Sequence, residues 1–143
     1  MEYVVGFLFD NDKESVLLVR KNKPQWQAGY LNGIGGKIEA DESPDEAIHR
    51  EFREETGLKD LTWVKFLTLE FSGGRVHFFK DFTELVIAKY MSVNDIGESI
   101  ERWDCGMLNS WVSNSRTIPN LKWIILLALD KDNLVANVKE MGS

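Results

Sequence analysis

The sequence predicts a single α/β domain, an α/β/α sandwich in which one mixed β-sheet lies between helices. Its 143 residues are close to the usual size of one domain and can bury most of their apolar surface. Segments rich in β-branched and aromatic residues lie on both sides of a strongly capped helix pattern, and a second helix pattern lies near the C-terminus. No internal repeat or low-complexity linker separates them. Helices packed on one sheet are the simplest assembly of such elements.

The chain opens with a predicted strand–turn–strand unit. Residues 3–9 and 15–20 are rich in β-branched and aromatic side chains, and residues 11–13 between them have the composition of a turn. A loop is predicted from 21 to 32. Because it mixes chain breakers with aromatic residues such as Trp26, it suits a substrate-facing loop as well as a plain connection.

The best-defined element is a helix that begins after Ser43. Ser43 stands at the N-cap position, Pro44 at the first helical position, and Glu46 completes a capping box. No breaker follows until Gly57, which supplies a left-handed helix end. The pattern therefore predicts a helix of about three and a half turns between Ser43 and Gly57.

The second half of the chain predicts an antiparallel meander followed by a helix. Three β-rich segments separated by turn signals at 72–74 and 80–81 form the meander: 61–71, 75–79 and 83–90. A polar stretch, 94–104, follows. Residues 119–130 begin with proline and continue with apolar residues at helical spacing, which predicts an amphipathic helix.

Composition and charge limit the classes of function. Hydrophobic residues at 43% and charged residues at 28% are ordinary for a globular protein. The net charge of −6 argues against a stable nucleic-acid binder, and it implies that a phosphate substrate needs a cation beside it. Cys105 is the single cysteine, so no intrachain disulfide can form and a cytoplasmic location is expected. The apolar runs are too short to span a bilayer, which predicts no membrane association, and a monomer and a homodimer both fit these observations.

The segment that carries the chemistry is residues 36–58, GKIEADESPDEAIHREFREETGL. It resembles the Nudix box, G-x5-E-x7-R-E-U-x-E-E-x-G-U with U aliphatic or aromatic, and every fixed position is filled at the right spacing. The resemblance implies the Nudix fold and a hydrolase that cleaves a diphosphate linkage with Mg²⁺, for which Mn²⁺ can substitute. In that reaction a metal-activated water attacks a phosphorus of a nucleoside-diphosphate-linked compound.

The positions of the carboxylates in this segment indicate the same metal chemistry independently of the resemblance. Glu51, Glu54 and Glu55 stand at i, i+3 and i+4 and so project from one face of the helix. Like charges there destabilise the helix unless a hard divalent cation neutralises them, and Mg²⁺ prefers carboxylate and phosphate oxygens. A solvated acidic face is the alternative for a helix taken alone. The cap, the glycines before the helix and Arg50 in the same segment favour the metal site.

The residues around the carboxylates have expected supporting roles. Arg50 precedes Glu54 by four residues, so its planar guanidinium can hold a catalytic carboxylate in one orientation. Glu42 is expected to close the loop by pairing with Arg50 or by accepting backbone donors at the helix start. Gly36 permits close approach of the backbone to metal and phosphate. Lys37 can then reach a phosphate.

The resemblance also assigns a ligand set and a base. It makes the side chains of Glu51, Glu54 and Glu55 and the carbonyl of Gly36 ligands of the metal. Glu51 is the leading candidate for the general base, although some family members place the base on a loop outside the box. A further carboxylate from outside the box often completes the site. Glu98 and Glu101 are the candidates and Glu101 is preferred, with a solvated loop charge as the alternative for either.

The substrate is a small-molecule nucleotide whose identity the box leaves open. Residues 31–39 resemble the entry to the box in MutT-like enzymes that hydrolyse oxidised purine nucleoside triphosphates, where an asparagine at the place of Asn32 reads the base. Asn120 and Trp123 fall where that branch completes the base pocket. Four aromatic residues are candidates for stacking on the base, although a place in the core or its rim is the commoner role of such residues: Trp26, Tyr30, Trp103 and Trp111.

A nucleoside triphosphate, split into a monophosphate and pyrophosphate, is therefore the expected substrate. A nucleotide sugar or another nucleoside diphosphate derivative is the second hypothesis. A non-catalytic Nudix module that binds nucleotide is the third, and the complete acidic set argues against it. An RNA 5′-end hydrolase is disfavoured by the acidic balance.

Overall fold

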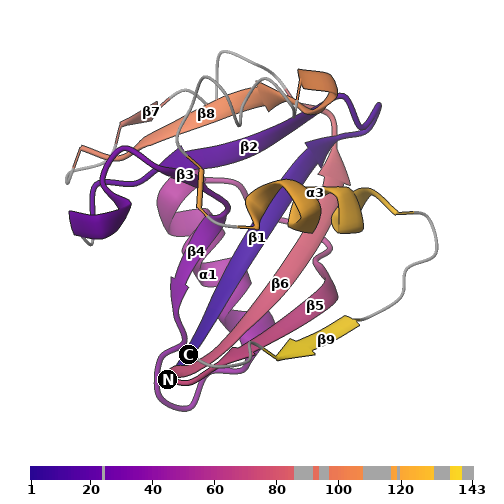
Figure 1. Ribbon diagram of the computed structural model, residues 1–143. Coiled ribbons are helices and arrows are strands. Elements are labelled where there is room, and N and C mark those ends of the chain that lie inside the picture. Colours follow the sequence, from indigo (N-terminus) through magenta and orange to yellow (C-terminus); the bar gives the residue numbers. More distant parts are fainter. Residues whose placement is uncertain are drawn as a thin grey trace.

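The computed structural model describes residues 1–23, 25–85, 92–93, 97–107, 117–118, 120–130 and 136–139. Nine strands within these residues form one mixed sheet (Figure 1): β1 Glu2–Asp10, β2 Ser15–Arg20, β3 Leu31–Asn32, β4 Ile34–Lys37, β5 Val64–Phe71, β6 Gly74–Thr83, β7 Ser92–Val93, β8 Ser99–Asp104 and β9 Ala136–Lys139. The order across the sheet is β7-β8-β2-β1-β6-β5-β9, while β3 pairs with β2 and β4 pairs with β1.

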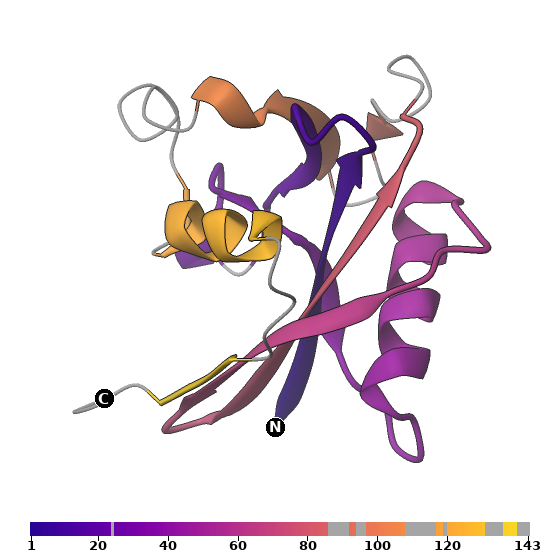
Figure 2. The ribbon, with the colours of Figure 1, turned by 90° about the vertical axis from the view of Figure 1, so that its right-hand side faces the viewer.

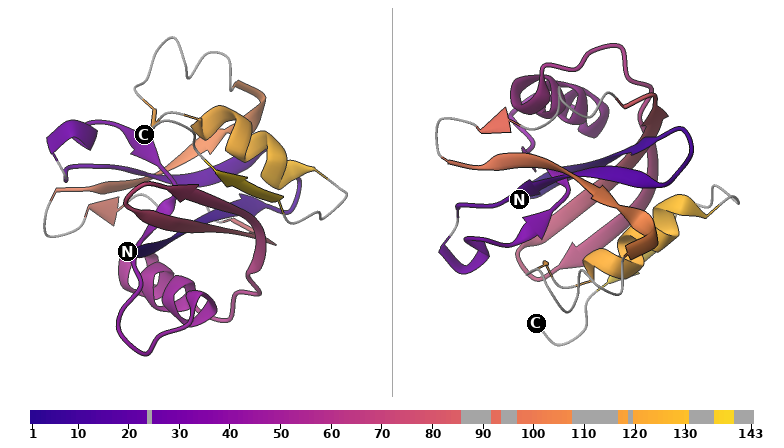
Figure 3. Two further views of the ribbon diagram at one scale, coloured as in Figure 1. Left: turned by 60° about the horizontal axis from the view of Figure 1, so that its bottom comes forward. Right: turned by 90° about the horizontal axis from the view of Figure 1, so that it is seen from above.

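Two helices cover the two faces of this sheet. Figures 2 and 3 show α1, Pro44–Thr56, on one side and α3, Leu121–Leu129, on the other, with β1, β5 and β6 between them. Short 3-10 helices, η1 Gln25–Gln27 and η3 Cys105–Met107, lie in the connections. The expected α/β/α sandwich is therefore confirmed. Neither described helix has the length and apolar character that crossing a membrane requires.

The central strand β1 separates two hydrophobic cores. It pairs in parallel with β6 from Glu2↔Arg75 to Asp10↔Thr83. Its side chains alternate: Val4 and Leu8 pack with the buried residues of α1, while Phe7 and Phe9 pack with those of α3. Because both faces of this strand are covered, its sequence is an almost continuous apolar run rather than an alternating one.

The local predictions for α1 are confirmed. The Ser43 hydroxyl accepts a hydrogen bond from the Glu46 amide at 3.1 Å, and the Glu46 carboxylate accepts one from the Ser43 amide at 2.9 Å. Gly57 ends the helix with φ 77°, and its N–H donates to the Arg53 carbonyl at 2.9 Å. Strands β1 and β2 also lie where the sequence predicted them.

The turn predicted at residues 80–81 is wrong. Strand β6 continues to Thr83, because its pairing with β1 extends through Phe7↔Lys80 and Leu8↔Asp81. The Lys80 side chain is 4% exposed, and its ammonium donates to the Ala128 carbonyl at the end of α3 at 2.8 Å. Lys80, which the sequence suggested to be a turn residue, is thus a buried strand residue that hydrogen-bonds to α3. Most of the third predicted strand, residues 86–90, lies outside the described residues.

Five strands were not predicted: β3, which occupies the end of the predicted loop 21–32, and β4, β7, β8 and β9. Residues 99–104 form β8, which pairs along its whole length with β2. The charged side chains of this strand make its sequence look like a polar loop. In the fold they form ion pairs, Glu101 with Arg20 and Arg102 with Asp10. Strand β9 pairs in parallel with β5 and had no recognised signal. The C-terminal helix is confirmed over Leu121–Leu129, while its expected proline start at 119 lies outside the described residues.

Candidate functional site

The site is centred on the contact between α1 and β4. Gly36 in β4 pairs with Val4 of β1, and α1 packs over this part of the sheet. A methyl group placed on the Gly36 α-carbon would lie 2.5 Å from Glu51 Oε1. The Glu51 carboxylate therefore lies directly against the Gly36 backbone, and a side chain at position 36 would displace it.

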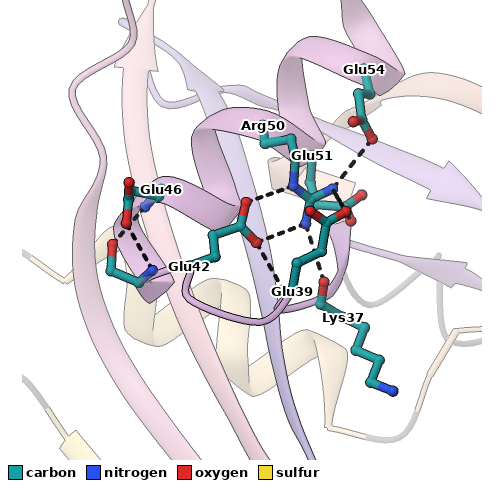
Figure 4. Close-up of polar contacts among 8 residues, drawn as sticks. Lys37, Glu39, Glu42, Glu46, Arg50, Glu51 and Glu54 are labelled. Atoms are coloured by element: carbon teal, nitrogen blue, oxygen red, sulfur yellow. Dashed lines mark hydrogen bonds and ion pairs between the residues drawn. The ribbon is translucent and has the colours of Figure 1, made fainter.

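Arg50 connects the helix to the loop that precedes it (Figure 4). Its guanidinium makes a bidentate pair with Glu42 at 2.7 and 3.0 Å, and it also donates to Glu51 at 3.0 Å and to Glu54 at 3.4 Å. A further hydrogen bond of 3.2 Å reaches the Lys37 carbonyl. The hydrogen bonds with Glu42, followed by those with Glu51, raise the pKa of Arg50 above its ordinary value. Arg50 is a fixed cation that holds three of the box carboxylates, those of Glu42, Glu51 and Glu54.

Glu42 closes the loop at the start of the helix. Besides the Arg50 pair, its carboxylate accepts a hydrogen bond from the Glu39 amide at 3.0 Å. The Arg50 and Glu39 hydrogen bonds lower the pKa of Glu42 below its ordinary value, so this residue stays ionised. The geometry contains the pairing with Arg50 that was expected for Glu42, and its backbone donor is Glu39 in the loop rather than an amide at the helix start.

The electrostatic environment of Glu51 differs from that of Glu42. Burial raises the pKa of Glu51, and the negative charges of Glu54 and Glu55 raise it further, while the Arg50 hydrogen bond opposes this. The Glu54 side chain is 58% exposed, and Glu55 is half-buried on the same helix. The helix therefore concentrates carboxylate charge beside Gly36 that Arg50 compensates only in part.

These residues fit a divalent cation. The donors are carboxylate and backbone oxygens, the ligands that Mg²⁺ prefers. A cation would relieve the penalty on the ionised form of Glu51. In the part of the chain that the structure describes, no three acidic, His or Cys side chains stand together ready to hold an ion, and Arg50 holds Glu51 and Glu54 instead. Binding a cation therefore needs a rearrangement of these side chains.

The structure places Glu101 on the other face of the sheet. Glu101 stands opposite Leu18 in the β2–β8 pairing, and Leu18 belongs to the core under α3. Its neighbour Ile100 belongs to the core under α1. Since side chains alternate along a strand, Glu101 points away from the face that carries the helix carboxylates. The structure does not bring it together with them.

Glu98, the other candidate outside the box, is 4% exposed just before β8. Its carboxylate accepts a hydrogen bond from the Asn22 amide at 3.0 Å and lies 3.4 Å from the Lys21 ammonium.

The residues expected to bind substrate come from separate parts of the fold. Asn32 lies in β3, where its side-chain oxygen accepts from the Gly33 amide at 2.8 Å. Asn120 is exposed at the start of α3 with φ 71°, an unusual conformation for a non-glycine residue, and makes no side-chain cap. The backbone joins the two regions, since the amide of Ile118 donates to the Leu31 carbonyl at 3.0 Å.

Other candidates are less directly placed. Lys37 is exposed, and Figure 4 shows its side chain extending away from the glutamates. Trp26 is 64% exposed in η1, and Trp123 is 37% exposed on α3. The Trp103 indole donates to Glu101 at 3.1 Å. Trp111 lies outside the described residues.

Sequence reasoning missed Arg20. Its guanidinium makes a bidentate pair with Glu101 at 2.8 and 3.0 Å and donates to the Gly29 carbonyl at 3.0 Å. In the sequence Arg20 looks like an ordinary charged residue at the end of a strand. Its partner Glu101 is 81 residues away, so no local pattern links the two.

Comparison with known proteins places the chain in one family. The model of the NUDIX domain matches residues 2–121. The 8-oxo-dGTP diphosphatase of Escherichia coli strain K12 is 31% identical over 71 residues, 50% of this chain and 54% of the relative. The CTP pyrophosphohydrolase of the same organism is 36% identical over 76 residues, 52% and 56% of the two chains. The chain thus matches about half the length of these relatives.

A solved structure shares the fold. The crystal structure of a mutator MutT protein from Bacillus halodurans aligns over 96% of this chain and 88% of its own, with a TM-score of 0.67 and 23% identity. The family match covers the box, strands β1 to β8 and the start of α3. This chain therefore belongs to the NUDIX domain family.

Proposed function

We propose that this protein is a Mg²⁺-dependent hydrolase that cleaves a nucleoside triphosphate, including oxidised purine forms, into a monophosphate and pyrophosphate. The observation that carries the proposal is the Glu51 carboxylate held against the Gly36 backbone by Arg50. This arrangement puts a partly buried acid in the middle of α1 beside a glycine of β4. It leaves an oxygen-rich face that suits a metal and a diphosphate together.

The proposed metal ligands are the side chains of Glu51, Glu54 and Glu55 and the carbonyl of Gly36. When bound, Mg²⁺ (or Mn²⁺ in its place) would neutralise charge on the phosphate oxygens and favour ionisation of a water. Arg50 would then orient Glu51, because its guanidinium already spans the loop and the helix.

Glu51 is the proposed proton acceptor. Its carboxylate lies against the Gly36 backbone and accepts a hydrogen bond from Arg50, so it is held in place beside the proposed metal, where it could take a proton from a water. Lys37 leaves β4 next to Gly36, and its flexible stem would allow its ammonium to reach a phosphate oxygen of the substrate.

Three residues support a nucleotide as the substrate. Asn32 offers a side-chain amide at the entry of the box, and Asn120 is exposed beyond the backbone contact that joins α3 to β3. The exposed indole of Trp26 is suited to stacking on a base. The two named relatives, an 8-oxo-dGTP diphosphatase and a CTP pyrophosphohydrolase, act on nucleoside triphosphates by their names.

We also place the activity in the cytoplasm. Cys105 is buried and has no disulfide partner, and burial raises the pKa of its thiol to about 12, which leaves it unreactive.

The test is a nucleotide panel with product identification. The purified protein is incubated with Mg²⁺ and nucleoside triphosphates, oxidised purine triphosphates and nucleotide sugars, and products are separated by ion-exchange chromatography. Pyrophosphate with a monophosphate supports the proposal. Two monophosphates from a nucleotide sugar would replace it with the second hypothesis. Tight calorimetric binding without turnover would replace it with a non-catalytic module.

A further inference from the structure

The loop between β2 and β3 is tied to its surroundings at both ends. We call residues 21–23 and 25–30 the Trp26 loop; Figure 1 shows it projecting from the sheet beside β2. Two backbone hydrogen bonds close it, from the Lys21 amide to the Tyr30 carbonyl at 2.8 Å and from the Gly29 amide to the Lys21 carbonyl at 2.7 Å. Its tip carries η1 and the exposed Trp26.

Arg20 joins the far end of this loop to β8. One of its terminal nitrogens donates to the Gly29 carbonyl at 3.0 Å, and the other two donors of its planar group bind Glu101 at 2.8 and 3.0 Å. The guanidinium also lies 5.9 Å from the centre of the Trp103 ring, within the range of a cation–π contact. Arg20 thus bridges strand and loop in a single fixed geometry.

The Glu101 carboxylate is fully occupied by donors. Besides the two Arg20 hydrogen bonds, it accepts one from the Ser99 hydroxyl at 2.7 Å and one from the Trp103 indole at 3.1 Å. Four donors fill the places where a cation would bind, and the side chain is only 17% exposed. A carboxylate in this setting positions its arginine and has no lone pair left for a metal.

The electrostatics agree with this role. Burial alone would raise the pKa of Glu101, but the hydrogen bonds from Arg20, Ser99 and Trp103 outweigh it and leave the pKa below its ordinary value. Glu101 therefore stays ionised and paired. Its side chain also points to the face of the sheet away from the helix carboxylates.

We infer that Arg20 and Glu101 form a clamp that positions the Trp26 loop for a substrate base, and that Glu101 is not a metal ligand. This inference rests on the proposed function in one respect: that the group Trp26 contacts is the base of a nucleotide. Both are positioning residues, because they act through the loop and touch no reacting atom. On this proposal Glu101 does not complete the metal site, the role that the sequence favoured for it.

The first test measures the loop itself and needs no substrate. Amide hydrogen exchange is compared between the wild type, R20M and E101Q. Breaking the clamp should accelerate exchange at the Lys21 and Gly29 amides about ten-fold or more. Unchanged exchange in both variants would overturn the clamp. If E101Q does not fold, R20K replaces it, since lysine keeps the charge but loses the bidentate geometry.

The second test separates positioning from metal binding in steady-state kinetics. Both variants should raise KM about ten-fold and change kcat less than about two-fold, and the Mg²⁺ concentration for half-maximal rate should stay within about two-fold of the wild type. The double variant R20M/E101Q should be no worse than either single one. A large rise in the Mg²⁺ requirement of E101Q that R20M does not share would instead make Glu101 a ligand.

A matched control lies on the same strand. Arg102 pairs with Asp10 at 2.8 Å and also donates to Ser15 and to the Leu85 carbonyl, so it resembles Arg20 in its bonding but contacts no residue of the Trp26 loop in the described structure. R102M should lower stability without changing exchange in the loop. W26A should raise KM like R20M, and the two together should not be additive; additive effects would show that the clamp does not act through Trp26. If no nucleotide is turned over by the wild type, the exchange experiment still decides the clamp.

Discussion

The carboxylate of Glu51 occupies the space that a side chain at Gly36 would fill. Glu51 Oε1 lies 2.5 Å from the position of a methyl group on the Gly36 α-carbon, and the carboxyl carbon lies 2.7 Å from it. Glycine at position 36 is therefore explained by the space that the Glu51 carboxylate needs, and not by backbone flexibility. It brings the helix acid against the backbone of the strand, where the proposed metal and phosphate would meet.

Replacing Gly36 with alanine should displace Glu51 and lower activity. A misplacement of about 1 Å in a catalytic group is expected to lower kcat about 100-fold. The measurement is kcat on the best substrate of the nucleotide panel, with circular dichroism to confirm folding. G73A is the control, because a methyl group at Gly73 would meet only the edge of the Phe71 ring, at 3.1 Å. A folded G36A with wild-type kcat would refute the role of this contact.

Glu54→Gln should abolish turnover and leave the fold intact. The side chain is 58% exposed, so the amide is accommodated, but the charge proposed to hold the metal is lost. We expect kcat to fall at least about 100-fold and no recovery of the wild-type rate at high Mg²⁺. E70Q is a matched control, since Glu70 pairs with Arg75 on the β5–β6 hairpin and lies outside the proposed site. Near-normal rates for E54Q would contradict the metal assignment.

Lys80→Met should lower stability. The buried ammonium donates to the Ala128 carbonyl at 2.8 Å and to the Asp130 carbonyl at 3.5 Å, and burial, with a smaller effect of Lys13, lowers its pKa. Leaving the Ala128 carbonyl without its donor costs about 1 to 3 kcal/mol. Urea unfolding measures the change. K59M, at an exposed lysine, should stay within about 0.5 kcal/mol of the wild type. An equally stable K80M would show that this contact adds nothing.

The Glu101 pair should make stability depend on acid pH. The folded pKa of Glu101 lies below its ordinary value of 4.5, so the pair stabilises the fold above pH 4.5 and this contribution is lost as the pH falls through the folded pKa. E101Q should be about 2 kcal/mol less stable than the wild type at pH 7, and the difference should shrink below pH 4.5. Urea unfolding at a series of pH values checks this. A difference that is independent of pH would point to packing instead of ionisation.

The secondary structure that depends on near neighbours was predictable. The Ser43–Glu46 capping box, Pro44 and Gly57 fix α1 through contacts within three or four residues, and the structure has them as expected. The alignment of Glu51, Glu54 and Glu55 on that helix follows from its period alone. The box also identified the family, since its spacing encodes a loop and a helix that are adjacent in the chain.

Tertiary pairing could not be predicted in this way. Residues 99–104 look polar because their charges are balanced by residues about 80 to 90 positions away, as with Arg20 for Glu101 and Asp10 for Arg102. Lys80 looks like a turn residue because the carbonyls that accept its hydrogen bonds belong to a helix 48 residues later. In each case the decisive partner is distant in sequence.

The sequence by itself determined the capped helix, its three carboxylates, the arginine and the glycine before them, because these depend on residue spacing within one short segment. Only the tertiary structure decided that Glu51 lies against Gly36, that Glu101 faces away from the helix and binds Arg20, and that the Trp26 loop is fixed to β8. The reason is physical: which face of the sheet a strand residue occupies depends on strand register, and register is set by hydrogen bonds and packing between segments far apart in the chain.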